Sequence, residues 1–188
     1  MKLMNDAFAM HTSMSTAPLG RTGPTVARLA LGTMTFGAET DQEDAFEQLD
    51  RFVDAGGTLI DTADVYAEGE SERVIGRWLA DRPVAAVYSS QLLRANDTGK
   101  AIAHHHGLEV QVIEELEEIR LFEDLPQDQR PSDFLGEMAL DGIRERFVQT
   151  QKWDVYPHTE RSLDFRRRVG WAIESALVTH PGETIVIA

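Results

Sequence analysis

The chain has 188 residues, enough for one good-sized hydrophobic core or two small ones. Its formal net charge of -14 disfavours nucleic acid and membrane surfaces, so we expect neither as a partner. Because the sequence has no cysteine, disulfides, thiolate catalysis and sulfur-ligated metal ions are excluded. No apolar run is long enough to span a bilayer, and the sequence predicts a cytoplasmic protein.

The N-terminal region is predicted to begin with a mobile tail over residues 1–17. Two glycines and a proline between Leu19 and Pro24 then indicate a hairpin turn. A short apolar stretch over residues 26–31 follows and ends at Gly32.

Two helices are predicted between residues 41 and 83, separated by a brief strand at 58–61 that places Asp61 at its carboxyl end. Asp41 is the N-cap of the first helix, and Ser71 opens the second. The positions expected to face inward are Ala45, Leu49, Phe52 and Val53 in the first helix and Val74, Ile75, Trp78 and Leu79 in the second.

The rest of the chain continues to alternate strands with helices. We expect strands at 84–88, 108–113 and 184–188, helices at 92–106 and 161–178, and a polar region at 114–158 with helical patches at 134–140 and 143–147. In the last helix the inward positions are predicted to be Leu163, Val169, Ala172, Ile173 and Leu177, and the run Arg166–Arg168 is predicted to be one exposed face. This alternation predicts an open, mostly parallel sheet with helices on both faces.

Three motifs in order resemble the opening of an aldo-keto reductase. They are residues 31–37 (Leu-Gly-Thr-Met-Thr-Phe-Gly), 60–66 (Ile-Asp-Thr-Ala-Asp-Val-Tyr) and 69–72 (Gly-Glu-Ser-Glu), and the resemblance covers roughly residues 18–82. It implies a hairpin and the first two strand–helix units of a barrel, with no closed barrel because two units cannot close eight strands.

The reductase resemblance implies roles for five residues. Asp61 and Tyr66 match the family's catalytic aspartate and tyrosine, and Gly32, Thr33 and Met34 would lie near the nicotinamide. A tyrosine acts as an acid on a carbonyl only when a neighbouring cation tunes it, and the family's lysine and histidine have no counterpart on a later strand here. We therefore expect no cofactor, or NADP(H) if this part retains binding.

From about residue 83 the chain resembles a histidine phosphatase of the phosphoglycerate mutase-like superfamily. The match runs through residues 87–98, 116–119, 156–162 and 182–187, and covers roughly residues 83–188. It implies that Arg94 is a phosphate-binding arginine and Glu118 the acid that protonates the leaving oxygen. A planar guanidinium suits this task because it pairs with phosphate oxygens and keeps its charge.

The phosphatase resemblance lacks its nucleophile, because no Arg-His-Gly motif occurs in the sequence. None of the six histidines follows an early strand, and the chain stops at Ala188, where the family's second histidine is expected. The contiguous trio His104–His106 cannot converge on one ion from a helix, so no metal site is predicted.

Together these patterns predict a histidine-phosphatase-like open sheet preceded by a reductase-like hairpin and β/α units, the two parts sharing one sheet. Two loosely coupled half-domains are the alternative. The predicted function is a catalytically incompetent fusion; the alternatives are residual phosphoester binding or hydrolysis, and NADP-dependent reduction. A small phosphate or phosphoester is the expected small-molecule partner, and the sequence leaves the oligomeric state open.

Overall fold

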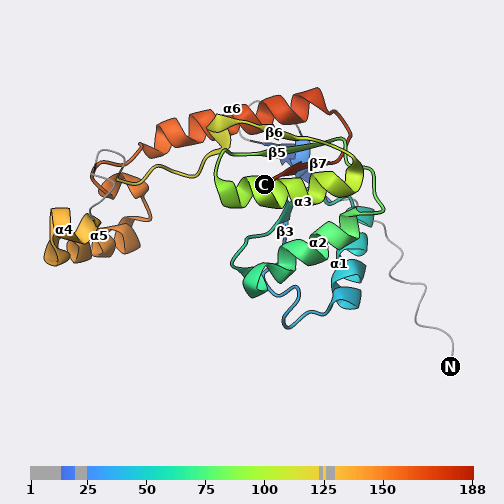
Figure 1. The fold of residues 1–188 in the computed structure, drawn as a ribbon, viewed down its shortest axis with the longest axis horizontal. Coiled ribbons are helices and arrows are strands. Elements are labelled where there is room, and N and C mark those ends of the chain that lie inside the picture. Colours follow the sequence, from blue (N-terminus) through green and yellow to red (C-terminus); the bar gives the residue numbers. More distant parts are fainter. Residues whose placement is uncertain (1–13, 20–24, 123–124, 126–129) are drawn as a thin grey trace.

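The computed structural model describes residues 14–19, 25–122, 125 and 130–188, arranged around a small parallel sheet (Figure 1). Its α-helices are α1 (Gln42–Asp54), α2 (Glu70–Leu79), α3 (Leu93–His106), α4 (Pro131–Leu135), α5 (Glu137–Thr150) and α6 (Ser162–Thr179). Its strands are β1 (Thr16–Pro18), β2 (Thr25–Ala27), β3 (Leu31–Gly32), β4 (Ile60–Asp61), β5 (Ala86–Ser89), β6 (Val110–Val112) and β7 (Ile185–Ile187). Short 3-10 turns are η1 (Tyr66–Gly69), η2 (Glu114–Leu116) and η3 (Trp153–Val155).

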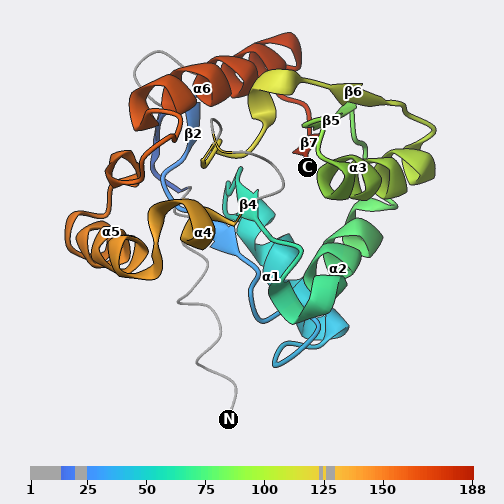
Figure 2. The same cartoon turned by 60° about the vertical axis from the view of Figure 1, so that its left-hand side comes forward.

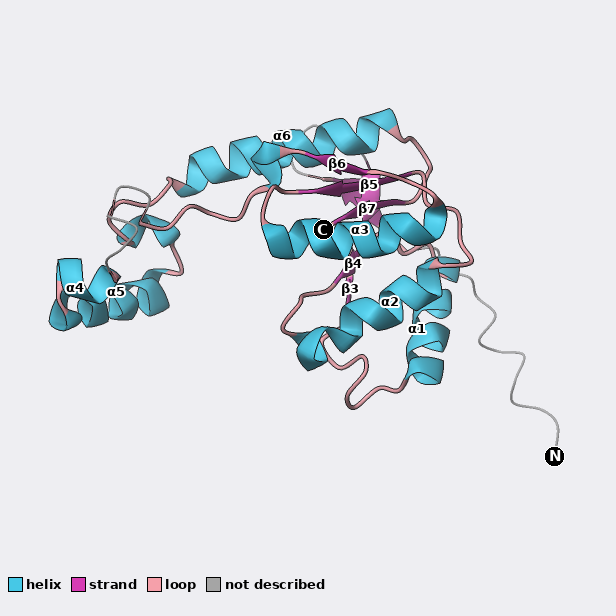
Figure 3. Ribbon diagram, in the orientation of Figure 1, coloured by secondary structure: helices cyan, strands magenta, loops and turns pink. Residues whose placement is uncertain are grey.

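The largest sheet has the order β6-β5-β7, and both pairings are parallel. Alternate side chains of β5 face opposite ways: Ala86 and Tyr88 pack with Ala176 of α6, whereas Ser89 lies near Gly99 of α3. Helices α6 and α3 therefore cover the two faces, as Figure 3 shows. The predicted open, mostly parallel sheet is confirmed, and no sheet closes into a barrel in the described part of the chain.

The reductase-like part contributes two further pairs of strands. Strands β1 and β2 are antiparallel, with Thr16 opposite Ala27, which confirms the predicted hairpin, although its turn at 20–24 lies outside the described residues. The predicted tail over residues 1–17 is too long, because Thr16 and Ala17 belong to β1; residues 1–13 lie outside the described residues. Strands β3 and β4 are parallel, with Leu31 opposite Ile60.

The expectation of one shared sheet is wrong for the described strands, because β3 and β4 pair only with each other. The two parts meet through side chains instead. Val84 and Val186 pack against the cluster that contains Val74 and Trp78 of α2. Burying these apolar side chains joins the parts without a backbone ladder between them.

The two N-terminal helices follow the predicted pattern closely. The Asp41 carboxylate accepts a hydrogen bond from the Asp44 N–H at 3.0 Å, as expected of an N-cap. All the predicted inward positions are buried except Val53, which is 45% exposed. That prediction is wrong because Val53 lies at the edge of the apolar stripe, in the last turn of α1.

Helices α4 and α5 stand apart from the sheet in both Figure 1 and Figure 2. Aromatic contacts hold this arm to the following turn, where the Phe147 and Trp153 ring centroids lie 4.6 Å apart and Trp153 and Tyr156 lie 6.0 Å apart. Within the described residues no helix is both long and apolar enough to cross a membrane.

Helix α6 is the element that departs most from the sequence prediction. Leu163, predicted to face inward, is 58% exposed, and Trp171 is 60% exposed. Ala172 and Ala176 are the fully buried positions, so the inner stripe of the helix is built from small residues.

Leu49 offers a direct test of the core. It is fully buried on α1, so Leu49→Ala should lower the free energy of unfolding by about 2–5 kcal/mol. The matched change on the same helix, Val53→Ala, should cost no more than about 0.5 kcal/mol because Val53 is partly exposed. Urea denaturation followed by circular dichroism measures both. Equal losses in the two variants would contradict this core.

Candidate functional site

The reductase-like residues lie where β3 and β4 end side by side. Thr33, just beyond β3, is fully buried, and its hydroxyl donates to the Asp61 carbonyl at 2.9 Å. The Ser71 hydroxyl at the start of α2 lies 2.8 Å from that of Thr33 and 3.0 Å from that of Thr62. These hydroxyls bind one another and the backbone, so the edge of this two-stranded sheet is filled by protein groups.

Of the remaining reductase-like residues, Asp61 takes part in this hydroxyl cluster through its carbonyl. Met34 is 65% exposed, and an added Cβ at Gly32 would meet no atom within 4 Å. Asp61 is exposed, and Tyr66 is half-buried on η1. The structure thus places the five predicted residues near one sheet edge but buries the side chain of Thr33.

No lysine of the described residues stands beside Tyr66. Lys100 lies on α3 with its ammonium 3.4 Å from Asp97, and Lys152 precedes η3 in the arm. The cation that would assist a tyrosine acid is therefore not supplied by either lysine.

The phosphatase-like residues come together at the start of α3. Arg94 lies on its first turn, as predicted, and its guanidinium forms an ion pair with the Glu118 carboxylate. A second carboxylate, Asp64, lies 3.8 Å from it. The structure thus joins the two predicted phosphatase residues to each other and to a residue of the reductase-like motif.

The surroundings of Arg94 are acidic. Glu72 on α2 is partly buried, and this burial, reinforced by the negative charge of Asp64, raises the pKa of its carboxyl group. Glu118 and Asp64 already neutralise the guanidinium. An anion approaching Arg94 must therefore displace carboxylates that the chain itself provides.

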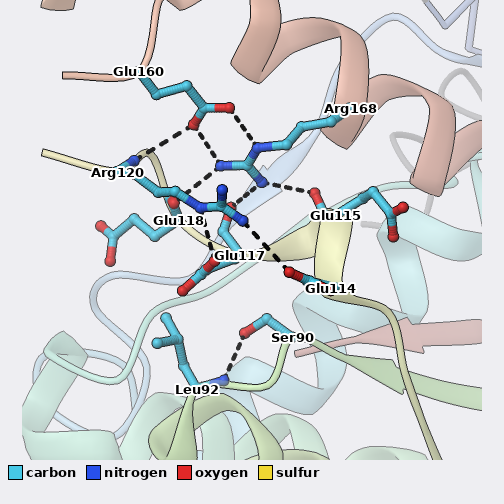
Figure 4. A network of polar contacts seen from close by, with 9 residues as sticks. All are labelled: Ser90, Leu92, Glu114, Glu115, Glu117, Glu118, Arg120, Glu160 and Arg168. Carbon is cyan, nitrogen blue, oxygen red and sulfur yellow. Dashed lines mark hydrogen bonds and ion pairs between the residues drawn. The ribbon is translucent and has the colours of Figure 1, made fainter. Parts of the chain in front are cut away.

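The sequence reasoning missed the densest polar network of the described residues, which centres on Arg168 (Figure 4). The Arg168 side chain is only 15% exposed, so the prediction that Arg166–Arg168 form one exposed face is wrong for Arg168. Its Nε and Nη2 each donate to the Glu160 carboxylate at 2.6 Å. This is a bidentate pair, the strongest geometry between arginine and a carboxylate.

The other guanidinium donors of Arg168 bind the backbone around η2. Nη1 donates to the carbonyls of Glu115 at 2.9 Å and Glu117 at 2.7 Å, and Nη2 donates to that of Glu118 at 3.1 Å. With the Glu160 pair, these contacts match the five N–H groups of a guanidinium. One side chain of α6 thereby fixes the path of residues 115–118.

Arg120 extends the network toward the start of α3. Its Nε donates to the Glu117 carboxylate at 3.0 Å, and its carbonyl accepts the Glu160 N–H at 2.8 Å. Figure 4 shows Ser90 and Leu92, which precede α3, on the other side of Glu117. The hydrogen bonds from Arg168 hold the pKa of the Glu160 carboxyl below its usual range.

A sequence signal for the inner position of Arg168 did exist. Arg168, Ala172 and Ala176 recur every four residues, which places them on one face of a helix. Glu160 stands within the phosphatase-like motif at 156–162, but nothing in the sequence pairs it with Arg168.

Metal ligation finds no support in the described residues, where no group of three or more His, Cys, Asp or Glu side chains is placed to hold an ion. His104 and His105, in the last turn of α3, contact each other edge to face with centroids 6.1 Å apart.

Comparison with known proteins shows a family likeness in the first part of the chain. The model of the aldo/keto reductase family matches residues 28–113. Residues 28–113, the aldo/keto reductase segment, are similar to this family. The match continues past residue 82, where the motifs place the boundary, through α3 and β6.

The aldo/keto reductase segment has curated relatives. It is 47% identical over 66 residues to the uncharacterized oxidoreductase YrpG of Bacillus subtilis and 45% identical over 67 residues to norsolorinic acid reductase of Aspergillus flavus. These alignments cover 33% and 32% of this chain but only 20% and 17% of the relatives, so the chain spans a fifth or less of their length. An uncharacterized 11.2 kDa protein of Pseudescherichia vulneris is 38% identical over 79 residues, which are 38% of this chain and 77% of that protein.

Solved structures give weaker likenesses. The protein YhfR of Bacillus stearothermophilus is 24% identical with a TM-score of 0.46, over 60% of this chain and 54% of that chain. A putative alpha-ribazole-5'-P phosphatase of Escherichia coli is 22% identical with a TM-score of 0.46, over 61% of this chain and 55% of that chain.

The Arg168–Glu160 pair gives a pH-dependent prediction. Because the folded Glu160 pKa is lowered, its stabilising contribution is fully present above the ordinary glutamate pKa and is lost as the pH falls through the lowered value. Glu160→Gln should therefore cost about 1–3 kcal/mol near neutral pH and less as the pH approaches about 3.

Urea denaturation at several pH values measures this difference. The control is Glu183→Gln, which removes a carboxylate that is 55% exposed and should change stability little. A cost for Glu160→Gln that does not change with pH would contradict the role assigned to the carboxylate.

Proposed function

We propose that this chain is a catalytically incompetent fusion, which folds but turns over neither carbonyl compounds nor phosphoesters. The observation that carries the proposal is the pairing of Arg94 with Glu118 and Asp64. A phosphatase needs an arginine open to phosphate and an acid free to protonate a leaving group. Here the two candidate groups bind each other.

The reductase-like edge supports the same proposal. Residues 32–34 would have to contact a nicotinamide, but Thr33 is fully buried and its hydroxyl is taken up by Asp61 and Ser71. This arrangement does not fit the cofactor. Asp61 at the end of β4 and Tyr66 on η1 remain as two polar side chains, and neither lysine of the described residues completes them.

The first test is carbonyl reduction. The purified chain should oxidise NADPH with a panel of aldehydes no faster than buffer does, because neither lysine of the described residues stands beside Tyr66. Absorbance at the reduced-nicotinamide band follows the reaction. Turnover that disappears in Tyr66→Phe but persists in Tyr156→Phe would overturn the proposal.

Phosphate binding without catalysis is a second candidate function, and the position of Arg94 favours it. The first turn of a 14-residue helix offers free backbone N–H groups and the positive end of the helix dipole, to which Arg94 adds a fixed positive charge. Binding of this kind needs no nucleophile. The neighbouring carboxylates and the net charge of -14 oppose it, so we expect weak affinity.

The second test is a phosphate titration followed by NMR shifts of amides 89–94. We expect a dissociation constant on the order of 1 mM, equivalent to about 4 kcal/mol. Glu118→Gln should tighten binding about two- to fivefold, since it removes the exposed carboxylate that competes for Arg94.

The matched control for this titration is Asp141→Asn, which removes the ion-pair partner of the exposed Arg144 on α5 and should leave phosphate affinity unchanged. If the amides do not move, or move equally in Arg94→Ala, the chain has no anion site at α3, and catalytic incompetence alone remains.

A further inference from the structure

Helix α6 carries apolar side chains on its outer face as well as on its inner one. It forms one outer edge of the molecule, beyond the sheet, in both Figure 1 and Figure 2. On that outer side Leu163 is 58% exposed, Trp171 60% and Val178 71%. A helix that is apolar on both sides is typical of one covered on both sides, so this face suits a partner.

The residues of this face are arranged symmetrically about a midpoint between Gly170 and Trp171. Leu163 lies seven residues before Gly170, and Val178 lies seven residues after Trp171. Arg167 lies three residues before Gly170, and Glu174 three after Trp171. Spacings of three, four and seven keep these positions on one side of a helix.

This symmetry makes the face complementary to itself. When two copies of α6 lie antiparallel about a two-fold axis through the midpoint, Leu163 of one copy comes opposite Val178 of the other. Arg167 likewise comes opposite Glu174, so opposite charges meet. Within one copy Arg167 and Glu174 are about 10 Å apart along the axis, which is too far for an ion pair.

The centre of the face allows close approach. A Cβ added at Gly170 would meet no atom within 4 Å. In the register set by the midpoint, Gly170 of one copy comes opposite Trp171 of the other, so the open space over the glycine can receive the indole ring. A groove lined by Leu19, Phe165, Val169 and Ile173 runs beside Gly170 and widens the apolar area.

Charge also favours a second copy over an unrelated acidic or basic partner. On this face one arginine, Arg167, and one carboxylate, Glu174, balance each other, while the chain as a whole carries -14. Arg167 is 72% exposed, and its contact with Asp164 is long at 4.0 Å. At physiological ionic strength, repulsion between the bulk charges of two copies is screened beyond about 8 Å.

We propose that the chain forms a homodimer through antiparallel, two-fold symmetric packing of the outer faces of two α6 helices. The helix of 18 residues is about 27 Å long, so the contact is smaller than a standard stable interface. The dimer is correspondingly weak, with a dissociation constant on the order of micromolar.

Sedimentation velocity of the full chain, from low micromolar to hundreds of micromolar, tests the proposal. The native chain should pass from monomer to dimer over this range. Arg167→Glu and Glu174→Arg should each weaken the dimer about tenfold or more, since each brings like charges together across the two-fold axis. The double charge reversal should restore the native affinity to within about threefold.

Gly170→Leu tests the close approach without relying on charge. It should abolish the dimer and keep the monomer folded by circular dichroism, because the site is open within the copy and leucine favours a helix more than glycine does. The matched control is Arg144→Glu on α5, an equally exposed charge reversal that should leave the dimer unchanged. A chain that stays monomeric throughout, or a dimer that the α6 variants do not weaken, or a double reversal that fails to restore it, overturns the proposal.

Discussion

The bidentate pair between Arg168 and Glu160 is the central contact of the hydrogen-bond network that joins α6 to the segment after β6. Arg168 also binds the carbonyls of residues 115, 117 and 118, so it sets where the segment after β6 runs. Because the Glu118 backbone is held there, its carboxylate reaches Arg94 at the start of α3. Arg94 in turn lies 3.8 Å from Asp64, and one line of polar contacts thus runs from α6 to the reductase-like motif at residues 60–66.

A second, apolar constraint holds the same two parts together. Val74 and Trp78 of α2 share a core with Val84 and with Val186 of β7, so α2 packs directly against the three-stranded sheet. This packing explains why β3 and β4 need not join that sheet. The hydroxyls of Thr33 and Ser71 satisfy each other at the strand ends, and the buried side chains supply the attraction that a longer ladder would otherwise give.

The sequence predicts those features that depend on near neighbours. The Asp41 cap and the inner face of α2 follow from local spacing. Helix α3 ends at Gly107 because glycine accepts the left-handed backbone found there, with φ of 64°. The four-residue spacing from Arg168 to Ala172 and Ala176 marks the face of the helix on which Arg168 lies. Nothing local identifies the carbonyls that it binds, which are some fifty residues away. The Arg94–Glu118 pair was predicted as two members of one site, but their direct contact follows from the path that Arg168 imposes.

In helix α6 a charged side chain is largely buried while three large apolar side chains are exposed, which is the reverse of the usual pattern. Its inner face holds an arginine and two alanines, and directional hydrogen bonds fix its rotation about its axis. Leucine, tryptophan and valine side chains are consequently left on the outer face, where hydrophobic burial would not have placed them. The same guanidinium that draws Glu118 toward Arg94 therefore also decides which face of α6 is turned away from the sheet. The hydrogen bonds of Arg168 thus determine both the pairing of Arg94 with Glu118 and the exposure of the apolar outer face of α6.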